Sequence, residues 1–239
     1  MDADAEIIHP VMSPDLLIGD RAEIQRALVS DFKNAADEAI AARGAFLVVL
    51  SGGSIAATFF PSLAQLPLDW SRVDFFWADE RAVPPEHPDS NYGEAMRLWL
   101  TPAGVPADRI HRMHGEDPDL RHAAQAYGAA LCRIAGDPPA LDFALLGVGP
   151  DGHIASLFPG HRALEEEREL ALPVPNAPKP PPRRLTLTLR ALSGAARIVI
   201  AGQGETKAQV IRRALEPGSA LPVGMLISRA PNVRVLLVK

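Results

Sequence analysis

The sequence predicts an α/β protein with a largely parallel sheet. Short apolar segments with β-branched or aromatic residues recur along the chain, and several are apolar at consecutive positions, as in strands that are covered on both faces. Segments with helical spacing separate many of them, and such alternation is typical of a parallel sheet. No internal repeat and no flexible linker divides the 239 residues. We therefore expect one domain over residues 1–239, with a possible smaller subdomain around 80–135.

The expected strands are the segments in which apolar residues are densest. They are residues 45–50 (AFLVVL), 73–78 (VDFFWA), 141–148 (LDFALLGV), 197–201 (RIVIA) and 233–238 (VRVLLV). The first long helix should begin after Asp20, which resembles a capping box with Glu23, and should stop at Gly44. Further helices are expected at 54–64, 91–100, 118–135 and 204–215.

Composition and charge exclude several classes of protein. With 47% hydrophobic and 22% charged residues the chain is globular, and with 5% aromatic residues its core should be mainly aliphatic. The single cysteine, Cys132, is interpreted as a small core residue in a reducing compartment. A net charge of −5 argues against non-specific nucleic-acid binding. The longest clean apolar run, 45–50, is too short for a membrane span, and the acidic residues 1–10 do not resemble a signal peptide, so a soluble cytoplasmic protein is expected.

The candidate site residues follow the expected strands, because ligands in open α/β sheets bind at the carboxyl ends of strands. Ser51-Gly52-Gly53-Ser54 comes after the first central strand and before a helix, where free backbone N–H groups and the helix dipole favour an anion. No Walker motif follows, so the segment is either a phosphate cradle or a tight strand–helix turn.

The second loop is charged where its strand ends. Asp79-Glu80-Arg81 follows the second strand, and Arg81 could clamp an anionic oxygen, unless the three residues only form a surface ion-pair cluster. Ser90 is a suitable N-cap for the helix that begins at Asn91.

The third loop, residues 147–153 (GVGPDGH), formally matches the dinucleotide fingerprint G-x-G-x-x-G. We reject this interpretation because the acidic residues about 20 positions further on close no apolar strand. A histidine beside a carboxylate on a glycine-fixed loop suits general-base chemistry, so His153 and Asp151 are candidates. The alternative is a structural histidine with Asp151 as a helix cap.

Basic residues further along the chain could complete an anion site, although each one taken singly is more often a solvated surface group. Arg183 and Arg184 precede the alternating segment LTLTL, and Lys207 follows Gly202-Gln203-Gly204. The proline-rich segment 173–182 should be extended and is a candidate rim for a pocket. The pair His111-x-x-His114 lacks further metal ligands, and no G-x-S-x-G elbow supports a serine triad.

Four segments together resemble a known family. They are SGGS at 51–54, DERAVPPEHPDSNYG at 79–93, LGVGPDGHIASLFPG at 146–160 and PPRRLTLTL at 181–189. In this order they closely resemble the lactonase branch of the glucosamine-6-phosphate isomerase/6-phosphogluconolactonase family. The resemblance implies a three-layer α/β/α sandwich around a mostly parallel sheet. It also implies hydrolysis of 6-phospho-D-glucono-1,5-lactone to 6-phospho-D-gluconate in the pentose phosphate pathway, without a required metal or organic cofactor.

The resemblance also implies the role of each candidate residue. The matching positions are Gly52, Gly53 and Ser54 in the phosphate loop, Arg81, Arg184 and Lys207 in the sugar-phosphate pocket, and Asp151 and His153 in the catalytic loop. The family usually continues its phosphate loop with Thr-Pro, whereas Ile55 and Ala56 stand here, and the lost hydroxyl bears on phosphate affinity more than on chemistry. His153 would activate water, and Asp151 would orient the His153 imidazole or stabilise its charged form. Arg81 or backbone amides would stabilise the oxyanion.

Two other functions stay open at this point. Glucosamine-6-phosphate deaminases share the DGHIA segment, but they carry a glutamate where Phe158 stands and a tyrosine where Arg81 stands. A sugar-phosphate sensor would carry a DNA-binding domain, whereas the residues before the first central strand read as a strand plus one helix. The expected partner is therefore a small-molecule sugar-phosphate lactone, with no nucleic acid and no membrane, and the expected state is a monomer or weak homodimer.

Overall fold

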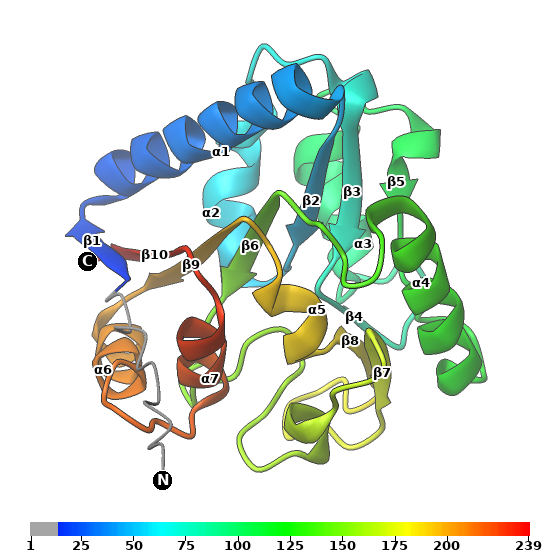
Figure 1. Ribbon diagram of the computed structural model, residues 1–239, viewed down its shortest axis with the longest axis vertical. Coiled ribbons are helices and arrows are strands. Elements are labelled where there is room, and N and C mark those ends of the chain that lie inside the picture. Colours follow the sequence, from blue (N-terminus) through cyan, green and yellow to red (C-terminus); the bar gives the residue numbers. More distant parts are fainter. Residues whose placement is uncertain (1–13) are drawn as a thin grey trace, which may run out of the picture.

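A seven-stranded sheet forms the centre of the molecule in the computed structural model, which describes residues 14–239 (Figure 1). Its strand order is β1-β10-β9-β6-β2-β3-β5, and every neighbouring pair is parallel. The strands are β1 (Asp15–Gly19), β2 (Phe46–Leu50), β3 (Val73–Trp77), β5 (Ile110–His111), β6 (Phe143–Gly147), β9 (Arg197–Gln203) and β10 (Val233–Val238). The five central strands expected from the sequence are confirmed, with shifts of one or two residues at their ends.

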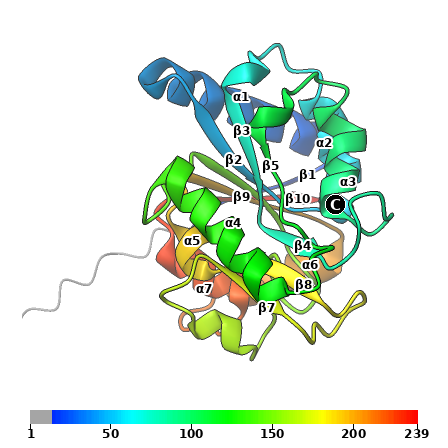
Figure 2. The same cartoon turned by 90° about the vertical axis from the view of Figure 1, so that its right-hand side faces the viewer.

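Helices cover both faces of this sheet. They are α1 (Arg21–Arg43), α2 (Ser54–Leu63), α3 (Asn91–Ala95), α4 (Leu120–Ala135), α5 (Leu189–Ser193), α6 (Glu205–Ala214) and α7 (Pro222–Arg229). Helices α1, α2 and α3 lie on one side, and α4, α5, α6 and α7 lie on the other (Figures 1 and 2). Right-handed crossovers produce this division, because the chain moves across the sheet in opposite directions before and after β5. The expected three-layer α/β/α sandwich is confirmed.

Helix ends follow the expected capping chemistry. The Asp20 carboxylate accepts a hydrogen bond from the Glu23 backbone N–H at 2.8 Å, and α1 ends at Gly44 with a φ of 77°. Ser90 Oγ accepts from the Gly93 N–H at 3.0 Å and caps α3. The helix expected over 91–100 is an α-helix only to Ala95 and continues as a π-helical turn.

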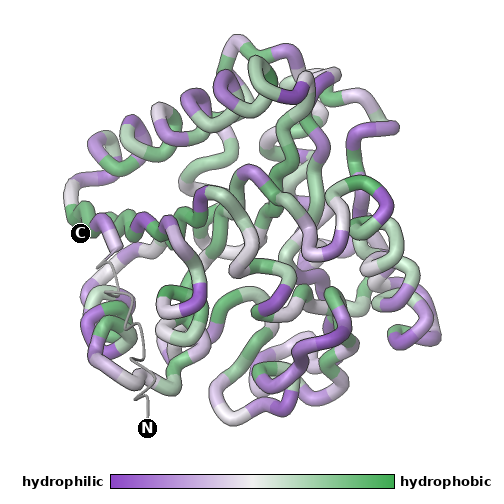
Figure 3. Tube along the Cα trace, in the orientation of Figure 1, coloured by the Kyte–Doolittle hydropathy of each residue, from purple (hydrophilic) through white to green (hydrophobic). Residues whose placement is uncertain are grey.

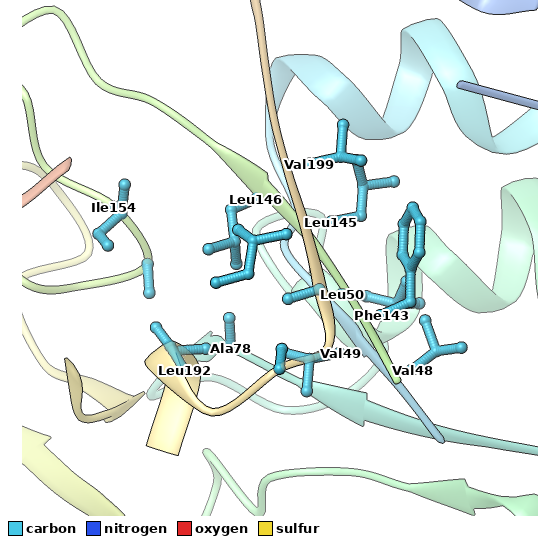
Figure 4. Close-up of a cluster of buried hydrophobic side chains, with 14 of the residues drawn as sticks. Val48, Val49, Leu50, Ala78, Phe143, Leu145, Leu146, Ile154, Leu192 and Val199 are labelled. Atoms are coloured by element: carbon cyan, nitrogen blue, oxygen red, sulfur yellow. The ribbon is translucent and has the colours of Figure 1, made fainter. Parts of the chain in front are cut away.

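The bulkiest side chains of the core are aromatic. Its largest fully buried side chains are Trp77, Trp99, Phe32, Phe46, Phe60, Phe75, Phe76 and Phe143. Phe32 and Trp99 contact edge to face with ring centroids 5.2 Å apart. Leucine, valine, isoleucine and alanine nevertheless make up most of the buried hydrophobic residues, so the expectation of a mainly aliphatic core is confirmed. Figure 4 shows a part of the core in which aliphatic side chains of β2, β6 and β9 surround the ring of Phe143.

Hydropathy follows these layers. The strands of the large sheet are mainly hydrophobic, whereas α1 alternates between hydrophobic and hydrophilic residues along its length (Figure 3). Cys132 is half-buried in α4 and packs against the core. None of the helices in residues 14–239 has the length and apolar character that crossing a bilayer requires.

A second, three-stranded sheet was not expected from the sequence. It has the order β4-β8-β7 and consists of β4 (Asp79–Arg81), β8 (Arg184–Leu187) and β7 (Ala171–Val174), paired antiparallel. The chain passes from β3 through Ala78 directly into β4, so the two sheets are joined at this residue. Within 80–135, β5 pairs with the large sheet and β4 pairs with β8, and the division of the chain into domains stays a prediction.

Candidate active site

A cavity of ≈ 270 Å³ lies where β2, β3, β6 and β9 end. Strands β2 and β6 are neighbours, and the connections that leave them run in opposite directions across the sheet. The cavity is therefore at the topological switch point, where open α/β sheets bind their ligands. The first and third glycine loops follow these two neighbouring strands, and both line the cavity.

Seven of the eight predicted site residues line this one cavity. They are Gly52, Gly53, Ser54, Arg81, His153, Arg184 and Lys207. The eighth, Asp151, is held against His153 at the edge of the cavity. Two residues that sequence reasoning did not single out, Asp79 and Lys179, also line it. For Lys179 the available signal was its place in the proline-rich segment, whose expected position at the rim of a pocket is confirmed by Lys179 and Pro180.

The first glycine loop presents the N-terminus of α2 to the cavity. Gly53 is the N-cap residue and has a φ of 78°, a conformation that glycine adopts without strain. Gly52 has to be glycine for a different reason, since a Cβ there would lie 1.9 Å from Asn91 Oδ1. The Ser51 hydroxyl is buried and has no hydrogen-bond partner among the described residues. This end of the cavity therefore offers unused donors to an anion.

A cation from a distant helix reaches the same place. Lys207 in α6 donates a hydrogen bond from Nζ to Ser54 Oγ at 3.0 Å. Burial, followed by the charge of Lys179, lowers the pKa of the Lys207 ammonium. The Gly53 N–H donates to Glu94 Oε2 at 3.3 Å, so a carboxylate already occupies one of the donors of the helix end. These contacts make the corner formed by α2, α3 and α6 a candidate anion-binding corner.

The third glycine loop holds an imidazole–carboxylate pair. His153 Nδ1 lies 2.5 Å from Asp151 Oδ1. Burial lowers the pKa of His153, although the neighbouring carboxylate acts in the opposite direction. Burial alone would raise the pKa of Asp151, but the hydrogen bond from His153 and its charge outweigh this effect and leave the pKa lowered. Both directions favour a neutral imidazole that donates from Nδ1 to an ionised carboxylate and leaves Nε2 as a base.

Close packing fixes the imidazole in the 147–158 segment. A Cβ on Gly149 would lie 2.1 Å from both Cε1 and Nδ1 of His153, so the ring lies directly on the glycine backbone. The Phe158 ring packs against the imidazole from another direction, with ring centroids 4.7 Å apart. Ala155 has a φ of 48°, which is uncommon for a residue with a side chain. The expected alternative, in which His153 begins a helix, is wrong because a tight turn and isolated bridges follow it.

The small antiparallel sheet brings two arginines together. Arg81 and Arg184 are directly opposite each other in the β4–β8 ladder, and both side chains line the cavity. Like charges at opposite positions repel, and this repulsion favours a bound anion between them. Asp79 Oδ2 lies 3.9 Å from Arg184 Nη1 and accepts a hydrogen bond from Ser156 Oγ at 2.7 Å.

Arg184 and Arg183 point to different surroundings. Arg184 is buried, and its Nε and Nη2 atoms donate to carbonyl oxygens of the proline-rich segment. Its Nη1 atom lies on the side of Ser156 and Asp79. Arg183 is exposed and donates to the Pro118 carbonyl at 3.3 Å. Of the two adjacent arginines, only Arg184 belongs to the cavity.

Glu80 has a structural role next to the site. Its carboxylate accepts from the backbone N–H groups of Arg81, Asn91 and Tyr92 and from the Ser90 hydroxyl. Burial raises the pKa of Glu80 to about 7, against the opposite effect of the three backbone donors. The charged segment 79–81 is therefore not a surface ion-pair cluster, and its residues have different surroundings. Glu80 fixes the turn before α3, whereas Arg81 faces the cavity.

The sequence model of the family "Glucosamine-6-phosphate isomerases/6-phosphogluconolactonase" matches residues 19–235. The chain belongs to this family. A 6-phosphogluconolactonase of Mycobacterium tuberculosis is 40% identical over 196 residues, which cover 78% of each chain. A probable chloroplastic 6-phosphogluconolactonase 3 of Oryza sativa is 36% identical over 230 residues, covering 88% of this chain and 70% of the rice protein.

Solved structures of the family share the fold. The 6-phosphogluconolactonase of Thermotoga maritima superimposes with a TM-score of 0.84 at 25% identity, covering 95% of this chain and 99% of its own. A 6-phosphogluconolactonase of Shewanella baltica gives a TM-score of 0.82 at 26% identity, with coverage of 96% and 99%. The sequence-based recognition of the family is confirmed.

Proposed function

We propose that this protein hydrolyses 6-phospho-D-glucono-1,5-lactone to 6-phospho-D-gluconate in the pentose phosphate pathway. The proposal rests on one observation, which is that the anion-binding corner and the His153 imidazole line the same cavity. Relatives with this name at 36% and 40% identity support the substrate class.

Binding begins at the phosphate. The 6-phosphate accepts hydrogen bonds from the backbone N–H groups of Gly53 and Ser54 and from the hydroxyls of Ser51 and Ser54. The Lys207 ammonium neutralises part of its charge. Glu94 must leave the Gly53 N–H as the phosphate arrives. Arg184 attracts the phosphate by its positive charge and can donate to it only from Nη1, because Nε and Nη2 donate to carbonyl groups of the proline-rich segment.

The chemical step needs a base and an oxyanion stabiliser. Nε2 of the neutral His153 takes a proton from water while the water oxygen attacks the lactone carbonyl carbon. Arg81 stabilises the negative charge that develops on the carbonyl oxygen. The bond from the carbonyl carbon to the ring oxygen then breaks, and this oxygen takes the proton from the imidazolium. Asp151 holds Nδ1–H and stabilises the charged ring during this cycle.

Lactone consumption by the purified wild-type protein and by His153→Ala tests the proposal. The variant should lose turnover by a factor of about 100 or more. It should still bind 6-phosphogluconate, since the phosphate corner is intact. Wild-type turnover no faster than spontaneous hydrolysis would refute the activity, and ammonia release from glucosamine 6-phosphate would indicate a deaminase instead. An equally active His153→Ala protein would refute the assignment of the base.

A further inference from the structure

Lys179 is a charged residue of the cavity to which the mechanism above assigns no role. Its Nζ lies 3.6 Å from Asp151 Oδ1, the same oxygen that contacts His153 Nδ1 at 2.5 Å. One carboxylate oxygen is thus shared between an imidazole and an ammonium. The two partners come from segments far apart in the sequence, so this contact depends on how the proline-rich segment is held.

Arg184 holds that segment in place. Its guanidinium donates to the carbonyl oxygens of Lys179 at 3.2 Å, Pro180 at 3.2 Å and Pro181 at 2.9 Å. Prolines have no N–H, so a proline-rich loop has few backbone donors of its own. A side-chain guanidinium from β8 replaces them, and the Ala177 N–H closes the loop on the Pro182 carbonyl at 2.8 Å. The backbone of Lys179 is therefore fixed relative to the cavity.

We propose that Lys179 is a positioning residue of the Asp151–His153 pair, and that it competes with the imidazole for Oδ1 of Asp151. The effect of Lys179 on the His153 pKa does not depend on the proposed function, whereas its effect on catalysis does. An ammonium at this oxygen reduces the attraction between the carboxylate and a protonated imidazole, and it repels the imidazolium directly. His153 then remains a neutral base at lower pH than the Asp151 carboxylate alone would allow.

The surrounding charges agree with this role. Groups that act on the His153 charge are Asp151, Lys179 and Asp79, and Arg184 lies across the Phe158 ring. The two carboxylates raise the pKa of His153 and Lys179 lowers it. The Lys179 and Asp151 side chains are 40% and 36% exposed, so solvent weakens the interaction. A shift of about half a unit to one unit in the His153 pKa is therefore expected when the Lys179 charge is removed.

The test is a titration of the His153 imidazole by NMR in the full-length protein. The chain has 7 histidines, and His153→Ala identifies the resonance. Lys179→Met should raise the pKa of His153, Lys179→Arg should keep the wild-type value, and Asp151→Asn should lower it. Arg183→Met is the matched control, because it removes a positive charge four residues away that contacts Pro118 and not the pair.

The outcomes separate this inference from the proposed function. A Lys179→Met protein whose His153 titrates as in the wild type would overturn the inference, and so would an equal shift in Arg183→Met. Circular dichroism and Lys179→Gln, a second neutral variant, show whether a change reflects misfolding. If the wild type hydrolyses the lactone, the acidic limb of its kcat/KM profile should move to higher pH in Lys179→Met. If it does not, the proposed activity fails while the titration still decides the role of Lys179.

Discussion

At the scale of single residues, the position of the His153 imidazole depends on the absence of a side chain at Gly149. The imidazole lies on the Cα of Gly149, and Asp151 Oδ1 would be only 2.6 Å from a Cβ at that position. Gly149 does not have a positive φ, so an alanine there meets no backbone strain. The glycine is required for space, and this separates it from Gly53, which is required for its conformation.

Gly149→Ala should therefore impair catalysis more than folding. The new methyl group would displace the imidazole by about 1 Å, and a displacement of this size can reduce turnover by a factor of about 100. Gly128→Ala is a matched control, because its Cβ would lie 3.7 Å from the nearest atom, in the middle of α4. The control should keep its activity and gain up to about 1 kcal/mol in the free energy of unfolding. Steady-state kinetics and urea unfolding check both expectations, and normal turnover in Gly149→Ala would contradict them.

At the scale of elements, the joint between β3 and β4 organises the site. Tyr127 in α4 stabilises this joint from the other side, because its hydroxyl accepts from the Trp77 N–H at 2.7 Å and donates to the Trp77 carbonyl at 3.0 Å. After the joint, Glu80 fixes the start of α3 and Arg81 enters the cavity. The three residues of β4 therefore connect the start of α3 to the cavity.

Glu80→Gln tests the electrostatics of this element. The folded pKa of Glu80 is about 7, above the unfolded value of 4.5, so between these pH values the folded protein retains a proton that the unfolded chain has lost. The free energy of unfolding of the wild type, relative to Glu80→Gln, should therefore fall as the pH rises from 4.5 to 7, by at most about 3 kcal/mol. Glu86→Gln, an exposed carboxylate in the same connection, should show no such trend. Urea unfolding at several pH values measures the difference, and a relative increase with pH would show that Glu80 is ionised when folded.

At the scale of the whole molecule, the site joins segments that the chain brings together only by folding. The anion-binding corner uses residues from α2 and α6, on opposite faces of the sheet (Figure 1). A ligand in the cavity should therefore stabilise the entire fold. Phosphate binding in particular should depend on Lys207, which is distant in sequence from the first glycine loop.

Thermal unfolding with 6-phosphogluconate measures this coupling. At 100 times its dissociation constant, a ligand stabilises a protein by about 2.7 kcal/mol, which corresponds to roughly 5–10 °C in Tm for a chain of this size. His153→Ala should retain the shift, whereas Lys207→Met should lose most of it at the same ligand concentration. Lys33→Met, which removes an exposed lysine of α1, is the control and should behave as the wild type. A full shift in Lys207→Met would remove this lysine from the phosphate site.

The central sheet and most of the candidate site were predictable because they depend on local patterns. Continuous apolar segments such as 46–50 indicate buried parallel strands, and glycine-rich loops after them indicate the ligand edge. The small sheet was not predictable, since β7 contains Pro173 and its pairing with β8 is established only by tertiary contacts. Helix α7 was missed because it is short and its N-cap residue, Leu221, has no side-chain capping bond. The sequence places Lys179 in the proline-rich segment at the rim of a pocket, but it gives no signal for the contact with Asp151.

The hydrogen bonds from Arg184 to the proline-rich segment have a consequence for protein engineering. Substitution of Arg184 would remove the hydrogen bonds that hold the carbonyl groups of Lys179, Pro180 and Pro181. The side of the cavity that this segment forms would then lose its support. Libraries that aim to accept lactones with a different charge, or none, should therefore randomise positions 179 and 207 and leave 184 constant.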